Sequence, residues 1–147
     1  MKELPDKLSD LLEVGLEDLE KCEKDERYFI DMGEWHKPWP GGICAVCMAG
    51  SVMAKRLKTD SRDLVLYPAS FDDDTKNKLM AISHVSLGAI WAAFKRLRFS
   101  TGLSVDSIMV TGEYGDAYFD PSSYSRNPRM FKVDIQRIIK ALRKYKL

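Results

Sequence analysis

The sequence contains no long hydrophobic run, and this absence argues against a membrane-spanning helix. A span needs about 20 consecutive apolar residues. The longest candidate, around residues 43–54, runs at once into Lys55, Arg56 and Lys58. The first six residues, Met-Lys-Glu-Leu-Pro-Asp, turn acidic immediately and lack the apolar core of a secretory signal. We therefore expect a cytoplasmic protein that has no membrane partner.

Cysteine and histidine are scarce, which limits the chemistry that the chain can perform. Three cysteines, Cys22, Cys44 and Cys47, cannot all pair within one chain, and without an export signal we interpret them as reduced thiols. The sequence also lacks a glycine-rich phosphate-binding loop and a complete set of catalytic residues. The leading hypothesis is accordingly a small accessory or interaction protein without catalytic activity, whose protein partner the sequence does not identify.

The composition is that of an ordinary globular protein. The 147 residues are 45% hydrophobic and 31% charged, and this length predicts a single domain over residues 1–147. A chain of this size buries roughly two-thirds of its unfolded surface, so it needs neither a metal nor a disulfide to fold.

Apolar periodicity predicts a mainly α fold of about five helices, with a few short extended segments or a minimal β-sheet. Asn127 followed by Pro128 is typical of a helix start, and Ser70, three residues before Asp73, resembles a capping box. The segment 99–127 shows no clear periodicity. The predicted helices cover residues 5–25, 43–57, 72–84, 86–98 and the segment after Asn127, and the predicted extended segments cover 27–32, 63–67 and 105–110.

The formal net charge of +1 hides an uneven distribution of charge. Residues 1–34 carry a net charge of −7, and residues 129–147 carry +6. Either the two terminal segments lie together and neutralise each other, or the basic end meets an anionic partner. In the second case the nucleic-acid-binding residues would be Arg137, Lys140, Arg143 and Lys144 on the polar face of the last helix, with Arg96, Arg98 and Arg129 as extensions.

The residues that could do chemistry are concentrated between Trp35 and Gly50, where a Trp/Pro/Gly loop leads into Cys44-x-x-Cys47. Two cysteines at this spacing at a helix start can bind zinc, form a redox pair or simply pack in a core. The alternative to an interaction protein is therefore a zinc-binding module, with His36 and Cys22 as the further ligands and His84 as a substitute for Cys22. No second Cys-x-x-Cys or His-x-x-x-His supports the metal hypothesis, so packed thiols are the preferred interpretation.

Two stretches resemble small uncharacterised proteins from phage and prophage genomes. They are Arg27 to His36 and the segment from Cys44 to Ala54, and the segment from Asn127 to Leu142 is similar too. The resemblance implies a cytoplasmic protein made during the growth of a phage or mobile element. It brings no catalytic residues with it.

Overall fold

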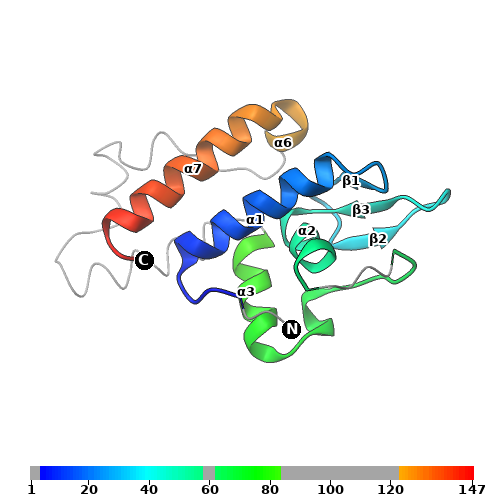
Figure 1. Ribbon diagram of the computed structural model, residues 1–147, viewed down its shortest axis with the longest axis horizontal. Helices are drawn as coiled ribbons and strands as arrows, with labels where there is room; N and C mark the ends of the chain where they lie inside the picture. Colours follow the sequence, from blue (N-terminus) through cyan, green and yellow to red (C-terminus); the bar gives the residue numbers. More distant parts are fainter. Residues whose placement is uncertain (1–3, 58–61, 84–122) are drawn as a thin grey trace.

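The computed structural model describes residues 4–57, 62–83 and 123–147. This part of the chain is mainly α-helical with a small three-stranded sheet, as the sequence predicted. The predicted segments 86–98 and 105–110 lie outside the described residues. The elements are α1 (Leu8–Glu23), β1 (Tyr28–Ile30), β2 (His36–Pro38), β3 (Cys44–Val46), α2 (Met48–Lys55), the 3₁₀ turn η1 (Pro68–Ser70), α3 (Asp73–Ser83), α6 (Ser123–Arg126) and α7 (Pro128–Lys144) (Figure 1).

Helix α1 is the centre of the packing, because α2, α3 and α7 all contact it (Figure 1). Its apolar stripe is buried at Leu12, Leu16 and Leu19, which confirms the amphipathic helix predicted there. Gly15 lies where α3 passes closest, since a Cβ atom at this position would stand 2.9 Å from a methyl group of Ile82.

The helix predicted over residues 43–57 is wrong in its first turn. Cys44–Val46 is instead the central strand β3, and α2 begins only at Met48 with Cys47 as its N-cap. Strand β3 pairs with β1 in parallel and with β2 in antiparallel, giving the order β1-β3-β2. β-Branched residues in this run favour extended backbone, and pairing on both sides outweighs the helical signal of the small residues that follow.

Two further boundaries differ from the prediction. Within 63–67 only Leu66 pairs, in an isolated bridge to His36. The N-cap interaction of α3 comes from Asp72, which accepts a hydrogen bond from the Thr75 amide at 2.8 Å. Ser70 instead belongs to η1, where its hydroxyl accepts from the amide of Tyr67.

The last helix was predicted correctly. The side chain of Asn127 accepts a hydrogen bond from the Met130 amide at 3.1 Å, and Pro128 occupies the first turn. The apolar face of α7 completes the main core through Phe131, Ile135 and Ile138. Its polar face therefore has a fixed direction in space, which decides where its many cations point.

Candidate functional site

His36 and Cys44 lie side by side in the sheet, on neighbouring strands. The Cys44 Sγ atom is 3.6 Å from His36 Nδ1, and the same Nδ1 lies 2.9 Å from the carbonyl oxygen of Leu64. Because a carbonyl can only accept, Nδ1 carries the proton and donates it to Leu64. Burial lowers the pKa of His36, so the ring is neutral. Its Nε2 atom has no hydrogen-bond partner among the described residues.

The other two predicted zinc ligands are separated from each other. Cys22 joins Cys44 in a small cluster with Tyr28 and Val46, whereas Cys47 packs into the main core. Within the described ranges no three His, Cys, Asp or Glu side chains are grouped to hold a metal ion. The structure thus brings Cys44 to His36 and Cys22 near Cys44, while Cys47 lies in another cluster. Zinc binding stays a prediction.

The electrostatics of the three thiols are set by burial. None of the cysteines is more than 2% exposed. Burial raises the pKa of Cys22, Cys44 and Cys47 to about 11 each. For Cys47 the hydrogen bond from the Gly50 amide works in the opposite direction but does not overcome desolvation. A thiol in this state is a weak nucleophile and a weak metal ligand, because both roles need the thiolate.

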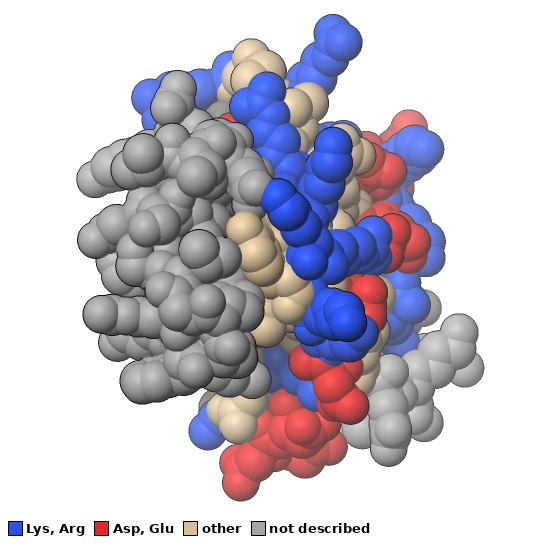
Figure 2. Space-filling model, turned by 90° about the vertical axis from the view of Figure 1, so that its left-hand side faces the viewer, with Lys and Arg blue, Asp and Glu red and all other residues tan. Residues whose placement is uncertain are grey.

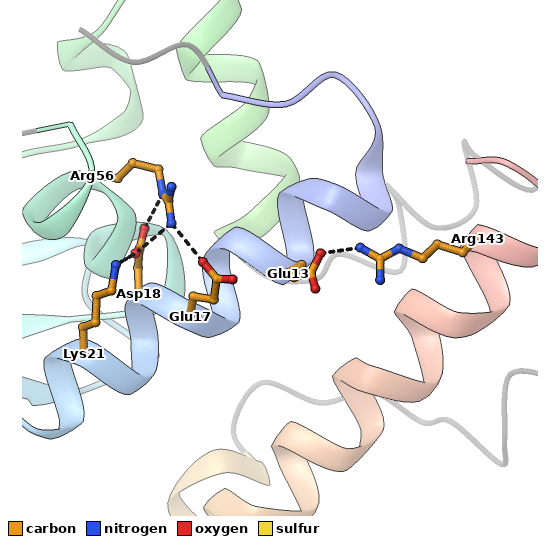
Figure 3. A network of polar contacts seen from close by, with 6 residues as sticks. All are labelled: Glu13, Glu17, Asp18, Lys21, Arg56 and Arg143. Atoms are coloured by element: carbon orange, nitrogen blue, oxygen red, sulfur yellow. Dashed lines mark hydrogen bonds and ion pairs between the residues drawn. The ribbon is translucent and has the colours of Figure 1, made fainter.

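The cations of α7 fall into two groups, and the first group faces α1. Lys132 pairs with Glu23 at 2.6 Å and with Glu20 at 3.9 Å. Arg143 pairs with Asp10 at 3.3 Å. It also pairs with Glu13, as Figure 3 shows. The acidic start and part of the basic end therefore lie together, and Lys132 and Arg143 are neutralised by α1, as one of the two sequence interpretations proposed.

The second group of cations points away from α1. Arg129, Arg137 and Lys140 are exposed, and so is Lys144 one turn further on. Within the described ranges, the ion pair of Arg137 is a 3.7 Å contact with Asp134 on its own helix. In the described part of the chain, Arg129 and Lys140 have no ion pair. Figure 2 shows Lys and Arg side chains gathered across the face of the molecule at the end where α7 finishes. We call Arg129, Arg137, Lys140 and Lys144 the outer cationic face.

Of the four predicted nucleic-acid-binding residues, Arg137, Lys140 and Lys144 belong to this outer cationic face, and Arg143 faces α1 instead. Arg129, which the sequence offered as an extension, is exposed and lies about three helical turns before Lys140, so the two residues share one side of α7. The apolar periodicity of α7 is the sequence signal that separates the outward-pointing cations from those facing α1. Cations opposite the buried apolar stripe must point outward.

A second polar network joins α1 to the end of α2. The Arg56 guanidinium donates to both carboxylate oxygens of Asp18, at 3.0 and 3.2 Å, and also to Glu17 (Figure 3). The Asp18 side chain is fully buried. Nothing in the local sequence pairs these residues, which lie 38 positions apart.

Comparison with known proteins gives no relatives: no protein-family model, curated protein or solved structure matches the chain. The resemblance to phage and prophage proteins therefore stays a prediction. Among the described helices, none combines the length and the apolar character that crossing a bilayer requires.

Proposed function

We propose that the protein is an accessory protein without catalytic activity that binds nucleic acid through the outer cationic face of α7. The observation that carries this proposal is the division of the α7 cations. Those directed at α1 are neutralised by its carboxylates, whereas Arg129 and Lys140 remain exposed without an ion pair among the described residues.

The dimensions of the outer cationic face suit a phosphate backbone. It spans 15 residue steps from Arg129 to Lys144, which is about 22 Å at a rise of about 1.5 Å per residue. Phosphate contacts need clustered Lys and Arg side chains, and binding is stronger when these side chains do not have to break an ion pair within the protein first. An exposed helix face held in place by its buried opposite side supplies them without reorganisation.

The state of the cysteines supports a binding role rather than an enzymatic one. The three thiols are buried and their pKa values are raised to about 11, so they are protonated at neutral pH. His36, which lies next to Cys44, is neutral and 1% exposed. This cluster offers neither an accessible nucleophile nor a solvent-facing base.

The test is fluorescence anisotropy with a labelled 20-base-pair DNA duplex, repeated with single-stranded DNA and RNA of the same sequence. Each phosphate neutralised on duplex DNA contributes about −0.9 to the slope of log K against log salt. Four cations on the outer face predict a slope of about −3 to −4. The double variant Arg129→Gln/Lys140→Gln should weaken binding and make the slope shallower by about 2.

The double variant Lys132→Gln/Arg143→Gln is the matched control, because it also removes two positive charges, but from the α1-facing side of the same helix. It should leave both the affinity and the slope close to those of the wild type. Equal weakening by the two double variants would mean that only overall charge matters. Salt-independent binding, or none to any of the three probes, would leave an acidic protein as the partner to be tested next and would refute the nucleic-acid proposal.

A further inference from the structure

Among the described residues, strand β1 is paired with β3 along one edge and with no strand along the other. Its hydrogen bonds to β3 come from odd-numbered residues: the Cys44 amide donates to the Arg27 carbonyl, and the Asp31 amide donates to the Val46 carbonyl, both at 2.9 Å. In a parallel ladder the residues between these points direct their backbone groups to the other side. The N–H and C=O of Ile30 therefore point away from β3, and no described backbone group pairs with them.

This open edge forms one wall of a groove. A hollow of about 450 Å³ runs along five consecutive residues, 29–33, and is also lined by Tyr124 and Ser125 of α6. Tyr124 is held firmly, since its hydroxyl donates to Glu23 and its ring packs edge-on against Phe131 with centroids 5.4 Å apart. The groove thus combines an unpaired strand edge with an anchored aromatic wall.

A carboxylate stands in the groove without a cation. One oxygen of Asp31 accepts a hydrogen bond from the Gly33 amide at 2.9 Å, which fixes the side chain. No Lys or Arg in the described ranges forms an ion pair with it. A ligand that brings a positive charge to this position would gain a charge-assisted contact that the protein itself does not supply.

We propose that an extended peptide segment of a protein partner adds to β1 as a fourth strand in this groove. One of its residues exchanges two backbone hydrogen bonds with Ile30. The side chain of that residue lies on the same sheet face as Ile30 and is apolar. The neighbouring residue lies opposite Asp31, on the other face, and is a lysine or arginine. This groove is separate from the outer cationic face. The peptide-binding proposal therefore does not depend on whether nucleic acid binds to that face.

The probe is a capped, fluorescein-labelled eight-residue peptide that alternates valine and lysine. It is titrated into the full chain by anisotropy and followed by two-dimensional amide NMR. We expect saturable one-to-one binding in the micromolar to millimolar range. The Ile30 amide should show the largest protection from hydrogen exchange on binding. A peptide N-methylated at its central valine cannot donate to Ile30, and it should bind at least tenfold more weakly.

Asp31→Asn tests the charge, because an asparagine oxygen can still accept from Gly33 and so preserve the turn. It should weaken binding of the valine–lysine peptide at least threefold and leave a valine–threonine peptide unchanged. Glu34→Gln is the matched control, since Glu34 lies just beyond the groove and contacts Lys37 instead. It should not change either affinity.

Three results would overturn the proposal. They are no saturation at millimolar peptide, equal weakening by Asp31→Asn and Glu34→Gln, and equal binding of the N-methylated peptide. A concentration-dependent dimer in sedimentation that protects the Ile30 amide without peptide would also overturn it, because a second copy of the chain would then occupy the edge. The N-methyl comparison uses the wild-type protein, so it does not depend on any variant folding.

Discussion

Replacing Arg56 by methionine should destabilise the protein more than any other single loss of charge among the ion pairs described above. Asp18 is a carboxylate with no exposed side-chain surface, and Arg56 supplies a two-point contact to it at 3.0 and 3.2 Å. Methionine keeps the apolar part of the side chain, so the substitution removes the guanidinium with little change in packing. Of the cations in the described part of the chain, Lys21, at 3.5 Å, would remain paired with the carboxylate (Figure 3).

The loss in free energy of unfolding expected for Arg56→Met depends on how deeply Arg56 and Asp18 are buried. Breaking a fully buried ion pair by removing one member costs about 3–5 kcal/mol, because a charge is left without compensation. Here Lys21 stays in place and the Arg56 side chain is 21% exposed, so water can approach the site. We therefore expect Arg56→Met to lower the free energy of unfolding by about 2–3 kcal/mol. Arg56→Lys keeps the charge but loses the two-point contact. This variant should lower the free energy of unfolding by about 1 kcal/mol.

The assay is urea unfolding at pH 7 followed by far-ultraviolet circular dichroism. The control is Lys37→Met, which removes an exposed cation that lies 3.7 Å from Glu34 and should change stability by less than about 0.5 kcal/mol. Asp18→Asn combined with Arg56→Met should recover part of the loss, since no buried charge then remains. If Arg56→Met costs no more than the Lys37 control, the burial argument is wrong.

Three further predictions concern the core and the α1–α7 contact. First, the pKa of each buried thiol is raised to about 11 from a usual value near 9. The folded state therefore holds these protons at pH values where the unfolded chain loses them. Urea unfolding should show stability that is full below about pH 8.5 and that falls towards pH 11 by about 1.4 kcal/mol per pH unit for each thiol. Second, Gly50→Ala should cost at least about 3 kcal/mol in thermal or urea unfolding, since its Cβ would stand 1.6 Å from the carbonyl oxygen of Trp35. Third, Lys132→Gln and Arg143→Gln should each cost about 0.5–1 kcal/mol at 50 mM salt and less at 500 mM, because both pairs are partly exposed.

Each of these three predictions would be contradicted by a specific result. Flat stability from pH 7 to 10.5 would mean that the thiols are accessible to water in the folded state. A Gly50→Ala variant with wild-type stability would require the Trp35 loop to move freely away from α2. Losses at Lys132 and Arg143 that do not change with salt would show that packing, not charge, joins these side chains to α1.

The two long helices were predictable because their signals are local. In α1 and α7 the apolar residues recur every three or four positions, and Asn127 and Pro128 mark the start of the last helix. Charge alone offered the pairing of the acidic start with the basic end as one of two alternatives, the other being an external anionic partner. The ion pairs of Lys132 and Arg143 with α1 show that the acidic and basic segments pair within the chain for this part of the basic helix.

The region around Cys44 could not be predicted, because non-local contacts decide it. Ile43 to Lys55 carries a short apolar run followed by small residues, which suits either a helix throughout or a strand and then a helix. Pairing of Cys44 with Tyr28 on one side and with Pro38 on the other selects the strand. As a result Cys44 lies in β3 and Cys47 caps α2, so the two thiols belong to different elements, and a shared metal or redox site stays a prediction. The open edge of β1 and the groove beside α6 have no local sequence signal at all.

The α1 contact also limits how nucleic acid can reach α7. Lys132 and Arg143 lie 11 positions apart, about three helical turns, so their ion pairs fix the rotation of α7 about its own axis at two points. The carboxylates that hold them are α1 side chains, which would repel phosphates approaching from that side. Contacts are thereby confined to the outer cationic face. Residues 129–147 carry seven cations in all. If all of them met phosphates, the salt slope would be about −6, whereas the outer face alone gives about −3 to −4. A measured slope near −6 would therefore mean that binding breaks the α1 ion pairs, and Lys132→Gln would then weaken binding as strongly as Lys140→Gln.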